Sequence, residues 1–218
     1  MDLLRYNIKL LFYQWNVLVF PLAITVLTIL VLYESSVKSF STLFLFESFS
    51  FLILGIITID ALFLERKLKL SEITTIKLIS PVQVFLVRWA LILLYGVSVL
   101  FFLAIALIHS TDFFRMRMFF GTMITVLFLC NFGFFLSSFL DPHLSTIGIF
   151  VVLSMGNGII SQLTEKLGED TLLFFPSIVT FFPEYEYFWQ NRILFTMFSF
   201  IFLMAGIKLM ENIEQQIG

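Results

Sequence analysis

The sequence predicts an all-α membrane protein that forms a single transmembrane domain over residues 1–218. Three observations lead to this prediction: 60% of the residues are hydrophobic, only 13% are charged, and 30 are phenylalanine. Soluble domains carry about 25% charged residues, so this composition suits a lipid bilayer better than water. The apolar residues also gather in long runs, as helices that cross a bilayer require.

Six of these runs are predicted to be long enough to cross about 30 Å of hydrocarbon as helices. They lie at 16–33, 43–64, 89–109, 119–140, 145–163 and 193–210. Six spans place both termini on one side of the membrane. If that side is the cytoplasm, it carries eight of the 13 Lys and Arg residues, namely Arg5, Lys9, Arg66, Lys67, Lys69, Lys77, Arg88 and Lys208. Cytoplasmic loops are typically rich in such cations, so we expect a multi-pass protein of the cell membrane with both termini inside.

Residues 1–15 are predicted to form an amphipathic helix that lies in the membrane interface. Their apolar side chains follow one stripe of a helix, with Arg5 and Lys9 beside it: Leu4, Ile8, Leu11, Phe12 and Trp15. The alternative is that this segment only extends the first span downward. Its polar residues and the lack of a small-residue cleavage site argue against a signal peptide, so we expect it to remain in the mature chain.

Residues 65–80 are predicted to form a short amphipathic helix on the cytoplasmic side. Its apolar residues recur every third position with polar residues between them: Leu70, Ile73, Ile76 and Ile79. This helix has to end near Ile79, because Ser80 precedes Pro81 and a residue before proline is disfavoured in a helix. The alternative is a solvated, positively charged loop, which explains the cations but not the pattern.

A second helix is predicted to begin at Pro81. Ser80 can cap it, Pro81 suits its first position, and Gln83 can complete a capping box. A helix from Pro81 to His109 would be about 43 Å long, roughly 13 Å more than the hydrocarbon of a bilayer. We therefore expect its base to project into the cytoplasm.

Residues 164–192 are predicted to form a re-entrant segment at the outer face. They include eight aromatic residues and an apolar run at 171–182 that is too short to span. Proline interrupts this run, and a break in a helix at membrane depth needs protein or a water-filled cavity beside it. We expect an outer gate built from Phe174, Phe175, Pro176, Phe181 and Phe182. The alternative is an aromatic belt at the lipid headgroups.

Polar and small residues within the predicted spans are less informative. Glu47 and Asp60 are ionisable residues inside the second span, where charge is costly, and the sequence leaves their roles open. Gly133 and Ser137 have the spacing that favours close packing between membrane helices.

Motifs of several enzyme classes are missing from the sequence. It contains no G-x-x-x-x-G-K-S/T phosphate loop, no HExxH and no GxSxG. Its two histidines, His109 and His143, fall on opposite sides of the predicted membrane. We therefore predict no catalytic site, cofactor or metal, and no binding of nucleic acid, since no large basic face remains once the loops are assigned. The single cysteine, Cys130, cannot form an internal disulfide.

The segment 65–89 resembles the cytoplasmic loop of ABC exporter permeases of the second membrane class, also called the type V fold. In that family an acidic-basic pair, a second Glu and a Ser-Pro turn precede a long helix with a cation about seven residues after the proline. The residues that match this pattern are Glu65, Glu72, Ser80, Pro81 and Arg88. Leu70-Ser71 replaces the Gly-Thr that usually precedes the second Glu. The segment 131–153 also resembles the region between the family's fourth and fifth spans.

This resemblance implies a permease subunit that does not hydrolyse ATP itself. It would pair with a second copy of the chain or a homologue and bind cytoplasmic ABC ATPase subunits, with the five matching residues coupling the two. The absence of a large outer domain and the abundance of Phe favour an amphipathic or hydrophobic substrate, such as a peptide toxin or bacteriocin, ahead of lipids or drugs. The alternatives are a non-transporting immunity or assembly protein that binds a peptide or partner without ATP, and a six-helix secondary transporter.

Overall fold

The computed structural model describes residues 81–110, 116–158 and 186–217. It also describes ten single residues: Arg5, Asn7, Ile8, Val19, Ala23, Val26, Gly55, Thr58, Ile59 and Leu173. Four helices make up the continuous ranges: α5 (Pro81–Ser110), α6 (Met116–Phe139), α7 (Pro142–Gly158) and α10 (Phe188–Ile217). No strand occurs in these ranges, and the described part of the chain is all-α.

Three of the four helices are long and apolar enough to cross a membrane, and the protein is a membrane-embedded helical protein. The apolar stretches are Val82–Phe102, Met116–Phe139 and Phe188–Asn212, and they cover most of the spans predicted at 89–109, 119–140 and 193–210. The span predicted at 145–163 is represented by α7, which has 17 residues. The spans predicted at 16–33 and 43–64 lie outside the described residues except for six helical positions, so the six-helix arrangement stays a prediction.

Helix α5 begins at Pro81, as the Ser-Pro step predicts, and continues for 30 residues. Proline is favoured at the first helical position because its missing N–H would have no partner there. At about 1.5 Å per residue the helix is about 45 Å long, which exceeds the hydrocarbon thickness of a bilayer by about 15 Å. The predicted long helix after the proline is therefore confirmed.

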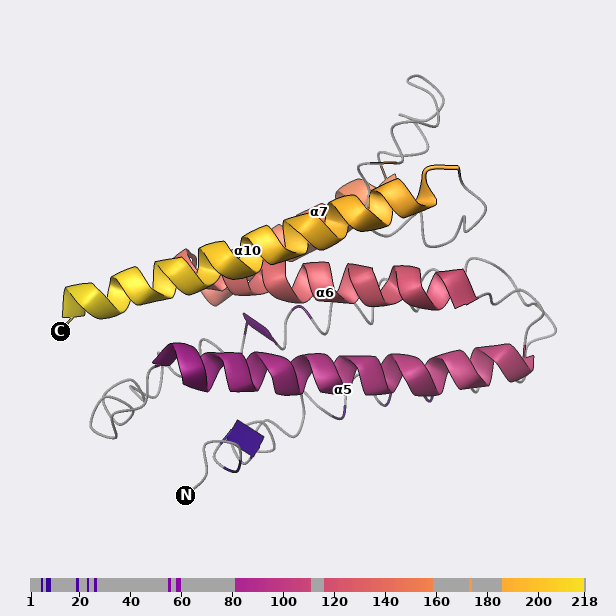
Figure 1. Ribbon diagram of the computed structural model, residues 1–218, viewed down its shortest axis with the longest axis horizontal. Helices are drawn as coiled ribbons and strands as arrows, with labels where there is room; N and C mark the ends of the chain where they lie inside the picture. The colour runs from indigo at the N-terminus through magenta and orange to yellow at the C-terminus, as the bar shows by residue number, and fades with distance from the viewer. Residues whose placement is uncertain are drawn as a thin grey trace.

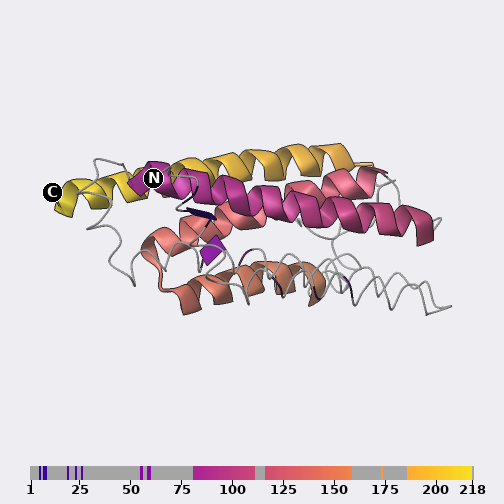
Figure 2. The same ribbon diagram turned by 90° about the horizontal axis from the view of Figure 1, so that it is seen from below.

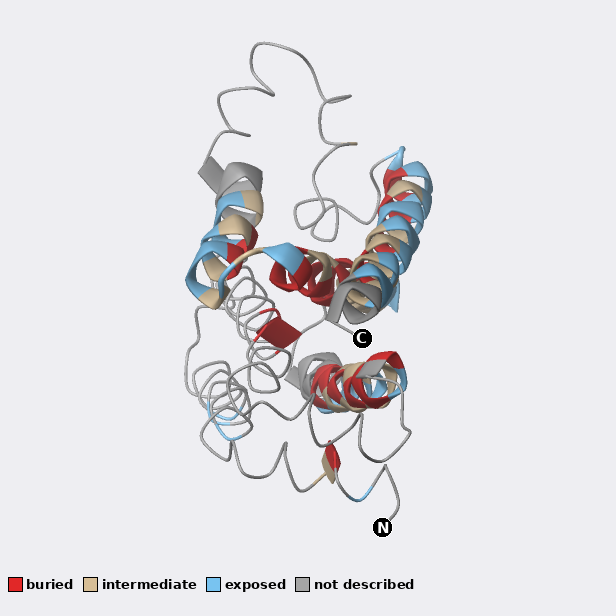
Figure 3. Cartoon of the chain, turned by 90° about the vertical axis from the view of Figure 1, so that its left-hand side faces the viewer, coloured by how far each residue is buried: buried red, intermediate tan, exposed pale blue. Residues whose placement is uncertain are grey.

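Helix α6 lies at the centre of the described helices and contacts each of the other three. Figure 3 looks nearly along the helices and shows α6 between α7 and α10, with α5 on a third side. Figures 1 and 2 show that α5 and α7 run in the opposite direction to α6 and α10. The ends that hold Pro81, Phe139, Pro142 and Ile217 are called the Pro81 end, and the opposite ends are called the Met116 end. The predicted topology makes the Pro81 end cytoplasmic.

Burial follows this arrangement, as the colours of Figure 3 show. Just over half of the residues in the apolar stretch of α6 are buried, but only 17% are buried in α10. One stripe of α10 is exposed and apolar, at positions i, i+4, i+7, i+8 and i+11: Ile193, Met197, Phe200, Ile201 and Met204. Lipid tails are as apolar as these side chains, so this stripe suits contact with the bilayer.

Helices α6 and α7 pack closely at Gly133. A Cβ atom placed on Gly133 would lie 3.0 Å from Cδ1 of Ile149 and 3.3 Å from the backbone oxygen of Gly55. The close packing predicted for Gly133 is thus confirmed. Ser137, which was predicted to share this role, donates its hydroxyl to the carbonyl of Phe134 in its own helix, over 2.8 Å.

Candidate functional site

The base of α5 is joined to the N-terminal segment through a buried arginine. Arg88 lies seven residues after Pro81, and both Arg88 and Asn7 are almost completely buried. The Nε and Nη2 atoms of Arg88 donate to Oδ1 of Asn7 over 3.1 and 3.0 Å. An ionised side chain within a membrane domain is costly unless it is hydrogen-bonded, so this contact holds Asn7 against α5.

The next residue of α5 begins a polar contact that joins three helices. The indole Nε1 of Trp89 donates to Oδ1 of Asn131 on α6 over 2.6 Å. The side-chain amide of Asn131 donates to Oγ of Ser199 on α10 over 2.7 Å and to the Ser199 carbonyl over 3.2 Å. Asn131 and Ser199 are both buried. Lipid tails are as apolar as the helix surface, so the hydrophobic effect does not drive membrane helices together. Hydrogen bonds of this kind help to hold such helices in contact.

An aromatic contact lies beside this polar group, toward the Pro81 end. The rings of Phe85 on α5 and Phe134 on α6 are stacked, with their centroids 3.9 Å apart and an interplanar angle of 11°. Gly206 of α10 also packs closely against Phe134. A Cβ atom placed on Gly206 would lie 2.6 Å from Cε1 of the Phe134 ring. Three helices therefore meet closely over this half of the bundle.

A second buried arginine joins α6 to α10 near the Met116 end. Nη1 of Arg192 donates to the carbonyl of Gly121 over 2.7 Å and to Oγ1 of Thr125 over 3.0 Å. Its guanidinium carbon lies 5.6 Å from the centre of the Phe188 ring, within the range of a cation–π contact. Helices α6 and α10 are thus joined by polar contacts at Arg192 and again at Asn131.

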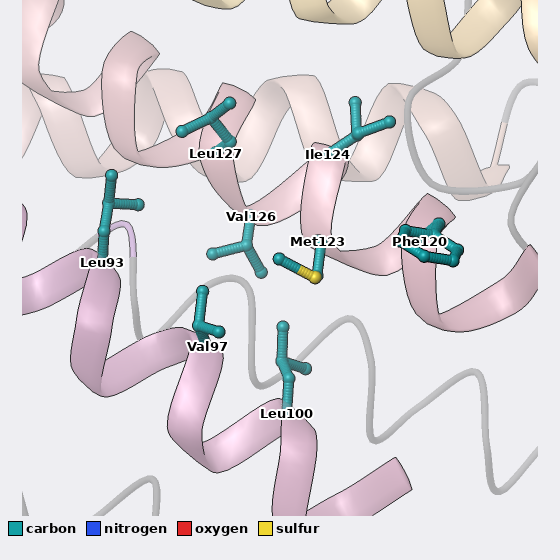
Figure 4. A pocket seen from close by; sticks show the side chains of 8 residues that line it. All are labelled: Leu93, Val97, Leu100, Phe120, Met123, Ile124, Val126 and Leu127. Atoms are coloured by element: carbon teal, nitrogen blue, oxygen red, sulfur yellow. The ribbon is translucent and has the colours of Figure 1, made fainter. Parts of the chain in front are cut away.

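A cavity separates α5 from α6 toward the Met116 end (Figure 4). Its volume is about 210 Å³, and it is lined by eight apolar side chains: Leu93, Val97 and Leu100 from α5, and Phe120, Met123, Ile124, Val126 and Leu127 from α6. Figure 4 shows Val97 and Val126 facing one another across it. Polar and aromatic contacts hold α5 to α6 in one half. In the other half the two helices meet in an apolar cluster that includes Leu100 and Val126, and the cavity lies beside it.

The predicted coupling residues are only partly described. Pro81 is the first residue of α5, and Arg88 is buried inside the chain, where it bonds Asn7. Glu65, Glu72 and Ser80 lie outside the described residues, as do Glu47, Asp60 and the whole of the segment 65–80. Arg88 is therefore placed to act within the chain and not at its surface.

The predicted outer gate also lies outside the described residues: Phe174, Phe175, Pro176, Phe181 and Phe182. Two facts bear on the segment that contains them. Its last five residues, from Phe188, belong to α10, and the side-chain amide of Asn191 donates to the carbonyl of Leu173 over 2.7 Å. Helix α10 therefore begins inside the predicted segment, and Leu173 of that segment is tied to the first turn of α10.

The polar contacts were not predicted from the sequence. Nothing in the pattern of residues 1–15 singles out Asn7, yet it is buried while Ile8 of the apolar stripe is partly exposed. The sequence does contain one indication for Asn131 and Arg192. Each is a strongly polar residue within or at the edge of an apolar run, where it is costly without a hydrogen-bond partner. That signal does not identify the partner, because Ser199 is 68 residues from Asn131.

Comparisons with protein-family models, with curated proteins and with solved structures find no match to this chain. The described residues contain no group of His, Cys, Asp and Glu side chains that could hold a metal ion.

Proposed function

We propose that the chain is a membrane-spanning permease subunit of an ATP-driven ABC exporter, which moves an amphipathic or hydrophobic substrate such as a peptide toxin or bacteriocin. One observation carries most of the support. Helix α5 starts directly at Pro81 and is held within its first three turns by Arg88 to Asn7 and by Trp89 to Asn131. A long helix that is hydrogen-bonded near its base is suited to transmit a force applied at that base.

The contact between Trp89 and Asn131 can serve as the pivot of this lever. Pro81 lies roughly 12 Å from Trp89 along the helix, and Ser110 lies roughly 31 Å away on the other side. A sideways displacement of Pro81 would therefore become about 2.5 times larger at Ser110. The cavity between α5 and α6 lies on the long arm. In this proposal the segment 65–80 receives the motion of an ATPase and passes it to Pro81.

The partners follow from the same proposal. The chain lacks a phosphate-binding loop, so ATP hydrolysis belongs to separate cytoplasmic subunits, and a second copy or a homologue completes the path across the membrane. The segment 164–192 forms the outer gate, and its link between Leu173 and Asn191 ties that gate to α10.

The proposal is tested by purifying the tagged chain from its own host membrane into nanodiscs. We expect a soluble protein with a phosphate-binding loop to co-purify and to give vanadate-sensitive ATP hydrolysis. Glu72→Lys should abolish both, because an acid on a basic loop is suited to pair with a cation of the ATPase. Glu211→Lys is the matched control, since it reverses a charge at an exposed position of α10 near the same end.

Two results would contradict the proposal. One is wild-type membrane protein that carries no ATPase activity although it is intact and monodisperse. The other is Glu72→Lys protein that keeps full ATP hydrolysis and its partner. A peptide bound by the chain with no ATPase present would instead favour the immunity or assembly protein.

A further inference from the structure

The lining of the cavity between α5 and α6 suits only a hydrocarbon group. All eight lining side chains are apolar, and its volume is about 210 Å³. Apolar cavities of about 150 Å³ stay free of water and bind a molecule of the size of benzene. The space is therefore large enough for several carbons of an alkyl chain and offers water no hydrogen-bond partner.

The cavity reaches the exposed apolar surface of the described helices. Phe120 lines it and is also 51% exposed, and Phe101 and Phe102 are exposed near the same end of α5. From Phe120 to Leu127 the lining extends along α6 for about 10 Å, and it begins about 6 Å from Met116. This range corresponds to the acyl-chain region of one leaflet, which is about 15 Å thick. A chain of a bilayer lipid is consequently the neighbouring group that can enter.

A cation lies where the head of such a lipid would be. Arg117 is exposed in the first turn of α6, three residues before Phe120 and seven before Ile124, on the stripe of the helix that leads to the cavity. Side chains of a helix lean toward its N-terminus, so the guanidinium of Arg117 extends toward the Met116 end and the membrane surface. Arginine there is suited to bind the phosphate of a lipid headgroup.

We propose that this groove binds one acyl chain of an anionic phospholipid from the leaflet at the Met116 end, with the lipid phosphate held at Arg117. The bound chain fills the space between α5 and α6 and fixes their separation in that half of the bundle. The proposal does not depend on transport or on an ATPase. It requires only that the described helices lie in a bilayer.

Native mass spectrometry can count the bound lipid. The full chain is exchanged into detergent with equal amounts of phosphatidylglycerol and phosphatidylcholine that have the same acyl chains. We expect the wild type to retain one phosphatidylglycerol molecule in preference to phosphatidylcholine. Arg117→Gln should keep a lipid but lose about fivefold of this preference, as expected for one cation near a membrane surface.

Two matched pairs of variants test the groove itself. Leu93→Trp fills it from α5, whereas Leu94→Trp places the same side chain at the neighbouring position, which is 64% exposed. Met123→Trp fills it from α6, whereas Met116→Trp lies at an exposed position of the same helix. We expect the filling variants to retain at least fivefold less lipid than their partners. The second pair keeps the test valid if Leu93→Trp fails to fold.

Photocrosslinking locates the bound chain by a second route. A phosphatidylglycerol with a diazirine in its acyl chain should label 93–100 and 120–127 in the wild type and in Leu94→Trp, but not in Leu93→Trp. Three results would overturn the proposal: equal retention in both members of each pair, labelling that stays on α10 alone, or no preference for the anionic lipid in the wild type.

Discussion

Arg88 and Asn7 are 81 residues apart in the sequence, and two hydrogen bonds join the guanidinium of one to a single oxygen of the other. Both side chains are buried. The contact therefore ties the beginning of the chain to the base of α5, beside the three-helix contact of Trp89.

Replacement of Asn7 tests the energy of this contact. A hydrogen bond to a charged group contributes about 1.5–3 kcal/mol, so Asn7→Ala should lower the Tm of the detergent-solubilised protein by roughly 5 °C. Asn7→Asp keeps an acceptor and should lose less. Arg5→Ala, at an exposed neighbouring position, is the control and should leave the Tm unchanged. Equal Tm values for Asn7→Ala and Arg5→Ala would show that the contact contributes nothing.

The bond between Asn131 and Ser199 can be measured by a double-mutant cycle. Asn131→Ala also removes the acceptor of Trp89, so it should destabilise the protein more than Ser199→Ala does. The coupling energy between the two positions should be about 0.6 kcal/mol and at most about 2 kcal/mol, as found for other hydrogen bonds between membrane helices. Reversible unfolding in mixed micelles gives the free energies of unfolding of the wild type, the two single variants and the double variant. Strictly additive effects would mean that the two side chains do not interact.

Gly206 and Gly148 offer the same substitution with losses of stability that we expect to differ in size. A Cβ at Gly206 would meet the Phe134 ring, which is held by its stack on Phe85, so Gly206→Ala should cost about 1–3 kcal/mol. A Cβ at Gly148 would meet only the end of the flexible Leu136 side chain, so Gly148→Ala should cost much less. Thermal unfolding compares them. Adding Phe134→Leu to Gly206→Ala should restore part of the loss, and a failure to do so would place the clash elsewhere.

Pro81→Ala tests whether the start of α5 sets the direction of the predicted coupling helix. Without proline, residues 65–80 can continue into α5 as one helix, so we expect an assembled complex with strongly reduced transport. Pro142→Ala is the matched control, because Pro142 begins α7 in the same way. Transport and ATP hydrolysis by purified complexes in liposomes measure the effect. Full transport by Pro81→Ala would contradict a coupling role for this break.

The predicted outer gate is tested by thiol labelling at Ser177 and Thr180. Cysteine at either position should react with an impermeant reagent at a rate that changes when ATP is added. The native Cys130 is buried, so it should give little background, and the wild type measures that background. Fast labelling at both positions that does not respond to ATP would identify an ordinary exposed loop.

Local chemistry was enough to predict several features of the described helices. Proline excludes the preceding residue from a helix and fits the first position of the next, so the start of α5 at Pro81 followed from two neighbouring residues. The length of an apolar run predicts that a membrane helix is present. It predicts the ends of that helix less well, since α10 begins at Phe188 and the apolar run was placed from residue 193. Gly133 indicated close packing because it has no side chain.

The partners of the polar residues were decided only by the tertiary structure. Hydropathy describes one residue and its near neighbours, whereas Asn131 is stabilised by Trp89 and Ser199, which lie 42 and 68 residues away. Asn7 accepts a hydrogen bond from Arg88, which lies 81 residues away, and no pattern within residues 1–15 identifies that partner. The cavity likewise depends on how far α5 lies from α6, and this separation results from the packing of whole helices.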